Sequence, residues 1–140
     1  MNSEAERVRV VNQRFYEALS AQNLLRLEQL WAHSPHVRCL HPGERMLSGW
    51  PTIRESWRAM FTRSIAFSVE PLIAEVNVHG PIAVVTCQEK FSSFTLDGSS
   101  VANLLATHIF LKQRGRWLLI HRHASPVVTT DGAAGGTPAP

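Results

Sequence analysis

The chain has 140 residues, of which 44% are hydrophobic and 18% charged, and its formal net charge is +3. This length and composition fit one globular domain with a hydrophobic core of its own. The basic residues are scattered without a run or stripe, so the sequence predicts no nucleic-acid partner. No apolar run approaches the roughly 20 residues that a membrane-spanning helix needs, so no membrane partner is expected either.

Cysteine usage and the two chain ends suggest a compartment and a domain boundary. Cys39 and Cys87 have no metal-binding or redox spacing, and the stretch MNSEAERVRVV lacks the continuous apolar segment of a signal peptide. We therefore expect a cytoplasmic protein with two free thiols. From Thr129 the chain is small, rich in Gly and Pro and without periodicity. This pattern predicts a single domain over residues 1–128 and a flexible tail over 129–140.

Apolar residues recur at helical spacing in three segments of the first half of the chain. A first helix is predicted over residues 4–20, where Ser3 and Glu6 form a capping box. A second is predicted over 23–33, because it begins at a favoured N-cap and ends before a Ser-Pro pair. A third is predicted over 51–63, with proline in its first turn.

The second half changes to the alternation that is typical of strands. Pro71 and a phase shift beside it predict a bulge on an edge strand, and Asp97-Gly98 and Gln113–Arg116 predict tight turns. Helices followed by a meander of strands predict an α+β fold, with the helices on one face of a curved sheet. The strands are expected at 37–40, 67–78, 82–94, 102–112 and 117–128.

The last predicted strand is apolar on both faces. If the helices cover Leu118 and Ile120, Trp117 and Leu119 lie on the other face, because side chains alternate along a strand. An apolar face of this kind needs a cover, and a second copy of the sheet would supply one. We therefore expect a homodimer through the convex face of the sheet.

Two segments carry a resemblance to a known superfamily. THIFLKQRGRWLLIHRHASP is similar to the C-terminal hairpin of the SnoaL-like polyketide-cyclase group and of the calcium/calmodulin-dependent protein kinase II association domain. HPGERMLSGWPTIRESW resembles the loop and third helix of the same group. Over about residues 5–127 the chain thus resembles the nuclear-transport-factor-two-like superfamily. This implies a cystatin-like cone, with three N-terminal helices on a strongly curved, mostly antiparallel sheet around one pocket. The superfamily includes isomerases, dehydratases, cyclases, hydrolases and non-enzymatic modules, so the resemblance leaves the activity open.

The ketosteroid-isomerase-like members of this superfamily use a catalytic Asp before a proline, and the resemblance places His41 there, ahead of Pro42. It places Phe15 at the oxyanion-hole tyrosine, with Tyr16 one residue away, and Thr107 at the second oxyanion acid. The acids that stabilise a dienolate are therefore missing, and the resemblance implies no steroid isomerase activity.

The resemblance also implies which side chains line the pocket. Trp57 of the third helix is expected to face inward, and Tyr16 and Trp50 are further candidates for an aromatic wall. The strand residues expected on the pocket side are Val84, Thr86, Gln88, Asn103, Leu105, Thr107, Ile120, Arg122 and Ala124.

Three of these residues are candidates for chemistry. His41 is a candidate general base, since an imidazole can take a proton near neutral pH; the alternative is a loop histidine bonded to the backbone. Arg122 would be a buried cation, which needs either a ligand carboxylate or a protein carboxylate such as Glu44 or Glu55. Thr107 or Arg122 would hold a ligand oxygen.

His121 and His123 share a strand face and are a possible start of a metal site. Metal sites need three or four ligands, and no third is indicated, with His108 left open as a candidate. Hydrogen-bonded histidines in a dimer interface are therefore the favoured interpretation. We expect neither a metal nor a cofactor.

Taken together, the sequence predicts a pocket that binds an unidentified small organic molecule. The activity would be that of a lyase, isomerase or cyclase that transfers a proton on a carbonyl-containing, anionic metabolite. The alternative is a non-catalytic ligand-binding or association module.

Overall fold

The computed structural model describes residues 3–127, in which three helices pack on one mixed, six-stranded sheet. This confirms the predicted α+β class. No helix in that range is long and apolar enough to cross a membrane. The predicted tail over 129–140 lies outside the described residues. The elements are α1 (Glu4–Ser20), α2 (Leu24–Leu30), β1 (Arg38–Leu40), β2 (Leu47–Ser48), α3 (Trp50–Arg63), β3 (Ala66–His79), β4 (Ile82–Thr95), β5 (Gly98–Gln113) and β6 (Arg116–Pro126).

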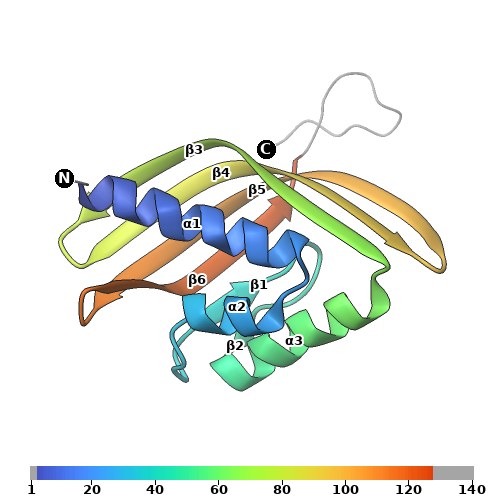
Figure 1. Cartoon of the computed structure of the whole chain (residues 1–140), viewed down its shortest axis with the longest axis horizontal. Coiled ribbons are helices and arrows are strands. Elements are labelled where there is room, and N and C mark those ends of the chain that lie inside the picture. The colour runs from blue at the N-terminus through green and yellow to red at the C-terminus, as the bar shows by residue number, and fades with distance from the viewer. Residues whose placement is uncertain (1–2, 128–140) are drawn as a thin grey trace.

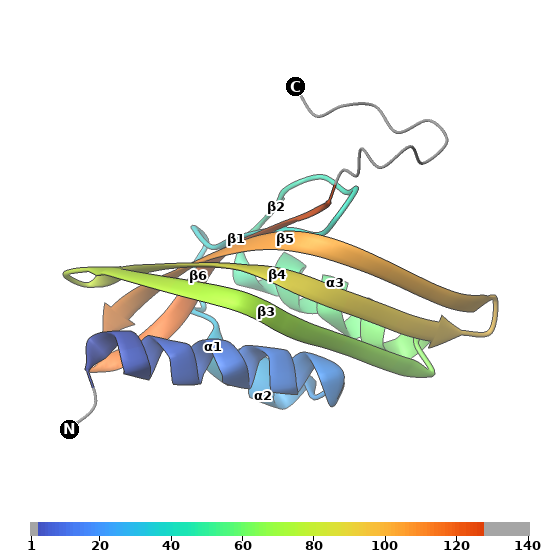
Figure 2. The ribbon, with the colours of Figure 1, turned by 90° about the horizontal axis from the view of Figure 1, so that it is seen from above.

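The strands follow the order β2-β1-β6-β5-β4-β3, and β1 pairs with β6 in parallel while all other neighbours are antiparallel. Figure 1 shows the long strands β3, β4 and β5 extending past the end of α1. Seen from above in Figure 2, the sheet bends, and α1 and α2 lie on one side of it. On the edge strand β3, the pairing with β4 shifts between Leu72 and Glu75, just after the proline that predicted a bulge there.

The helix starts follow the predicted capping. The side chain of Ser3 accepts a hydrogen bond from the backbone N–H of Glu6, and Asn23 accepts one from Arg26. The second helix is shorter than predicted and ends at Leu30. Trp31 leaves the helix in an extended conformation and forms a bridge to Leu119 of β6, so pairing with the sheet ends the helix early.

A two-residue turn joins β5 to β6. Arg114 and Gly115 both have positive φ, 53° and 77°, which is the geometry of a type I′ hairpin. Because this turn matches the twist of the strands, it fixes the register of the hairpin that carries Arg122.

A bulge in β6 changes which side chains face the helices. Ile109 pairs with His121 while Phe110 pairs with Leu119, so Ile120 is the extra residue. Trp117 and Leu119 are buried, and the Trp117 indole donates a hydrogen bond to Glu4 of α1. The expectation that the helices cover Leu118 and Ile120 is therefore wrong. Beyond the bulge the alternation is reversed, and the buried side chains are those of Arg122 and Ala124.

Candidate functional site

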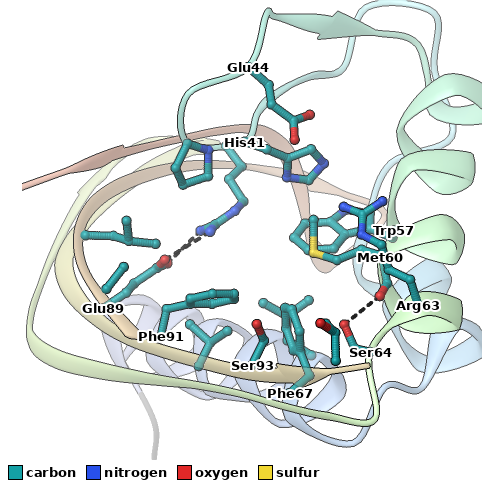
Figure 3. Close-up of a pocket in the computed structure, with 17 residues that line it drawn as sticks. His41, Glu44, Trp57, Met60, Arg63, Ser64, Phe67, Glu89, Phe91 and Ser93 are labelled. Carbon is teal, nitrogen blue, oxygen red and sulfur yellow. Dashed lines mark hydrogen bonds and ion pairs between the residues drawn. The ribbon is translucent and has the colours of Figure 1, made fainter. Parts of the chain in front are cut away.

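A cavity of about 250 Å³ lies between α3, the inner face of the sheet and the loop after β1 (Figure 3). Its walls are mostly apolar and come from elements far apart in the sequence, which only the bent sheet brings together. The apolar lining residues include Leu19, Trp57, Met60, Phe67, Phe91 and Leu104. The charged or titratable ones are His41, Glu44, Arg63, Glu89 and Arg122.

Arg122 and Glu89 form a two-pronged ion pair on the sheet side of the cavity. Nη1 lies 2.6 Å from Oε2 and Nη2 lies 3.0 Å from Oε1, and both side chains are almost fully buried. Burial alone would raise the pKa of Glu89, but the charge and hydrogen bonds of Arg122 outweigh it and lower that pKa to about 2. Arg122 thus has a protein carboxylate as its partner, and this partner is Glu89 rather than Glu44 or Glu55.

Further polar side chains form hydrogen bonds to this ion pair underneath the cavity. The Tyr16 hydroxyl donates to Oε2 of Glu89 over 2.5 Å, and Arg122 Nη1 lies 2.9 Å from Nε2 of His108. Arginine can only donate, so Nε2 accepts and the ring carries its proton on Nδ1, which donates to Oδ1 of Asn12 over 2.7 Å. Burial and the nearby guanidinium lower the pKa of His108 to about 3, so this ring is neutral. We call these five residues the buried network.

Tyr16 therefore supports the cavity without lining it. Burial, followed by the nearby charge of Glu89, raises the pKa of its phenol, which remains a hydrogen-bond donor. The Sγ atom of Cys87 lies 3.0 Å from the phenol oxygen, and both this cysteine and Cys39 are free and buried.

His41 lies at the opening of the cavity and is itself buried. Its Nε2 is 2.8 Å from the Ser56 hydroxyl, which donates its own proton to the carbonyl of Ile53 over 2.6 Å. The serine oxygen therefore accepts from Nε2–H, and Nδ1 keeps a lone pair with no hydrogen-bond partner in residues 3–127. Burial, and then the positive charges of Arg122 and Arg63, lower the pKa of His41 to about 4. The ring is neutral at pH 7 and can accept a proton or a hydrogen bond at Nδ1.

Two charged side chains border the same opening. Figure 3 shows Glu44 on the loop above His41 and Arg63 on α3 beside Met60 and Trp57. Neither charge forms an ion pair within the described part of the chain. The opening therefore has one cation and one carboxylate available to a ligand.

Of the residues proposed from the sequence for this site, His41, Trp57 and Arg122 line the cavity together. Trp50 does not; its indole is buried in the hydrophobic core and stacks on His33, with ring centroids 4.9 Å apart. Ile120 is the bulged residue of β6 and packs against the hydrophobic core.

The expected inward side of β4 and β5 is wrong by one residue. Glu89, Phe91 and Ser93 of β4 line the cavity, as do Ala102 and Leu104 of β5. A shift of one residue moves every side chain of a strand to the other face. The residues expected inside that lie on the opposite face, or are exposed, are Val84, Thr86, Gln88, Asn103, Leu105 and Thr107.

The opposite face carries a shallow groove that includes His121 and His123. The pKa of His121 is lowered by burial, then by its neighbour His123 and by Arg38. Among residues 3–127, no three His, Cys, Asp or Glu side chains gather closely enough to hold a metal ion.

Four functional or supporting residues were missed from the sequence: Asn12, Ser56, Arg63 and Glu89. His108 was considered only as a metal ligand, and its place is in the buried network. A signal existed for Glu89, because the alternation places it on the same face of the strand as the apolar residues Val85, Cys87 and Phe91. No sequence pattern indicated Ser56, since its role depends on the loop that brings His41 against α3.

A bent sheet, N-terminal helices on one face and a cavity between them define the NTF2-like, cystatin-like class of α+β proteins. Residues 8–129 match the SnoaL-like domain family, and the chain belongs to that family. This confirms the resemblance drawn from the hairpin and the third helix.

Several solved structures share the fold over nearly their whole length. An NTF2-like protein of Streptomyces avermitilis with the provisional description dehydratase is 29% identical, with a TM-score of 0.83 over 90% of this chain and 97% of that one. A protein of Thiobacillus denitrificans, provisionally described as a calcium/calmodulin-dependent protein kinase type II association domain, is 25% identical, with a TM-score of 0.73 over 85% and 94%. An NTF2-like superfamily protein of Salmonella enterica shares the fold at 18% identity and a TM-score of 0.82, over 91% and 94%.

A curated relative is longer than this chain. The F-box protein SKIP8 of Arabidopsis thaliana is 26% identical over 121 residues, which are 86% of this chain and 50% of that protein. The chain thus spans about half the length of this relative.

Proposed function

We propose that the cavity binds a small, largely apolar molecule with a carbonyl group, and that His41 takes a proton from the carbon next to that carbonyl. The observation that carries this proposal is the neutral His41 ring, whose Nδ1 lone pair is free at the opening of an apolar cavity. Aromatic and aliphatic walls favour an apolar body, as in most small-molecule sites.

The chemistry follows from the charges around the ring. In the proposed step a C–H bond breaks, an N–H bond forms at Nδ1, and the electron pair moves into an enolate. The positive charges of Arg63 and Arg122, which disfavour the protonated ring, stabilise the negative enolate. The proton then returns to another carbon in an isomerisation, or to a leaving hydroxyl group in a dehydration.

The protonated His41 is a stronger acid than an ordinary imidazolium ion, because its pKa is lowered from 6.5 to about 4. Proton return is therefore fast, and proton removal needs a carbon that the carbonyl already makes acidic. The provisional dehydratase description of the Streptomyces protein supports this reaction class.

The test is solvent deuterium exchange at carbon. Carbonyl compounds that raise the melting temperature of the wild-type protein are incubated with it in D₂O and followed by NMR. We expect His41→Gln to abolish exchange while the same compound still stabilises the variant. His36→Gln is the matched control, because that histidine is exposed on the preceding loop. If compounds stabilise the protein but never exchange deuterium at carbon, the proposed proton transfer is refuted and the protein is a binding module.

The association module is the second candidate, and the outer face of the sheet favours it. Ile73, Val101 and Leu105 are 73%, 71% and 49% exposed there. We propose that a second copy of the chain covers this convex face and that His121 and His123 lie in that interface. Light scattering across a concentration series tests this, and a monomer at all concentrations would refute it.

A further inference from the structure

We infer that the ligand of this cavity carries a carboxylate and that Arg63 is its counterion. The inference rests on the proposed function and names the class of molecule that the cavity takes: an oxo acid with a short apolar or aromatic side chain.

The two terminal nitrogens of the buried Arg122 guanidinium are excluded as the anion site, and its Nε is the one nitrogen of the group with no hydrogen-bond partner in residues 3–127. Both of its terminal nitrogens bind Glu89, and Nη1 also contacts His108. A ligand carboxylate there would displace a buried protein carboxylate and leave that charge without a partner, which is strongly unfavourable. The anion therefore has to bind elsewhere in the cavity.

Arg63 differs from the other arginines of α3. Arg54 pairs with Glu28 and Arg58 pairs with Glu55, whereas Arg63 has no carboxylate partner in residues 3–127 although it lines the cavity. Its charge also reaches the catalytic candidate, since it lowers the pKa of His41. A planar guanidinium without a partner is suited to a carboxylate, which it can bind through two parallel hydrogen bonds.

The neighbouring charges set where this anion lies. Glu44 borders the same opening and repels an anion, so the carboxylate is confined to the α3 side. Neutral His41 adds no competing charge, and the charge of Glu89 is already compensated by Arg122.

This placement orients the rest of the molecule. With the carboxylate at Arg63, the apolar part packs against the wall formed by Phe67 and Phe91, an edge-to-face pair with centroids 5.2 Å apart. The carbonyl-bearing carbon then lies near His41, whose ring borders the same opening. A small, largely apolar molecule that carries both a carboxylate and a carbonyl group is an oxo acid, which is the ligand class that we infer.

The experiment compares matched acids and amides, so that charge is the variable. Hydrocinnamate and hydrocinnamamide, and isocaproate and isocaproamide, are titrated into the full chain by NMR at neutral pH. In the wild type we expect each acid to bind about tenfold more tightly than its amide, because a charged partner strengthens the hydrogen bonds to an exposed arginine. Arg63→Gln should abolish this preference, because the affinity for the acids should fall about tenfold and that for the amides much less.

Two further variants complete the design. Arg58→Gln removes an arginine from the same helix that pairs with Glu55 in solvent, and it should keep the acid preference. Glu44→Gln removes the repelling charge, and it should strengthen binding of the acids a few-fold and that of the amides less.

The outcomes separate this inference from the function on which it rests. If acids and amides bind the wild type equally, or if Arg63→Gln keeps the preference, the carboxylate inference is overturned and the binding pocket stands. If neither acids nor amides bind, the proposed function and the inference fall together.

Discussion

Replacing Glu89 by Gln should be among the most destabilising single changes in this chain. The substitution keeps the shape of the side chain but removes the charge that compensates Arg122, which is 97% buried. Removing one partner of a buried ion pair costs about 3–5 kcal/mol. The pKa gives a second measure, since a carboxyl whose pKa falls from 4.5 to about 2 on folding contributes about 3 kcal/mol above pH 4.5. This contribution is lost as the pH falls from 4.5 to 2.

The assay is equilibrium unfolding in urea at pH 7, followed by tryptophan fluorescence and circular dichroism. A domain of this size has about 5–15 kcal/mol of stability, so the variant should unfold at much lower urea concentration, and its melting temperature should fall by about 10 °C. A fall in the midpoint without a change in slope would show that the stability falls while the surface exposed on unfolding stays the same.

The double variant Glu89→Leu with Arg122→Met distinguishes the loss of one charged partner from the loss of the whole ion pair. A buried ion pair replaced by hydrophobic residues of similar size is often neutral or stabilising, so the double variant should be more stable than Glu89→Gln. A loss below about 1 kcal/mol for Glu89→Gln would refute the reasoning. A double variant that is no more stable than the single one would do the same.

Three further outcomes are expected. The pKa values of His41 and His108 are lowered from 6.5 to about 4 and about 3, so below pH 6.5 the unfolded chain binds protons that the folded chain does not. The urea concentration at the unfolding midpoint should therefore decrease as the pH is lowered from 6.5 to 4.5. His108→Gln, which keeps one donor and one acceptor, should make this slope shallower, and an unchanged slope would contradict the assignment. Ala102→Phe should fill the cavity, so binding of hydrocinnamate by NMR should be lost while the melting temperature stays within a few degrees; retained binding would place the ligand elsewhere. Leu105→Lys should give a monomer by light scattering, whereas Leu96→Lys, in the exposed β4–β5 turn, should leave a dimer.

The architecture could be predicted because it depends on local patterns. The capping residues Ser3 and Asn23 and the Arg114-Gly115 turn act within a few residues of themselves, and their effects are present in the structure. The order of helices and strands then restricts the fold to few arrangements.

The faces of the strands could not be predicted in the same way. Ile120 is an ordinary apolar residue, and only its pairing opposite Ile109 and Phe110 makes it a bulge. One extra residue exchanges the two faces, so an alternation carried through it places Trp117 and Arg122 on opposite sides. In the structure the first packs on α1 and the second lines the cavity, both on the inner face.

The residues of the site could be predicted only where their placement does not depend on strand register. His41 could be proposed because it lies beside a proline in a loop between two identifiable elements, whereas Glu89 and His108 depend on strand registers. The resemblance placed Thr107 at an oxyanion position, but its neighbour His108 is the residue that faces inward. An error of one residue along a strand assigns the wrong side chain to the cavity face.

The buried network links the stability of the fold to the chemistry of the opening. If its only effect were stability, a hydrophobic pair would serve as well as Glu89 and Arg122. Arg122, however, also lowers the pKa of His41, which is neutral at pH 7 and has a free lone pair as a result of burial and two nearby cations. In the variant with Glu89→Leu and Arg122→Met, the pKa of His41 should therefore rise toward its ordinary value, which NMR titration of the ring measures. An unchanged pKa in a folded double variant would mean that burial and Arg63 suffice to keep this ring neutral, and that the network has no part in tuning the proposed base.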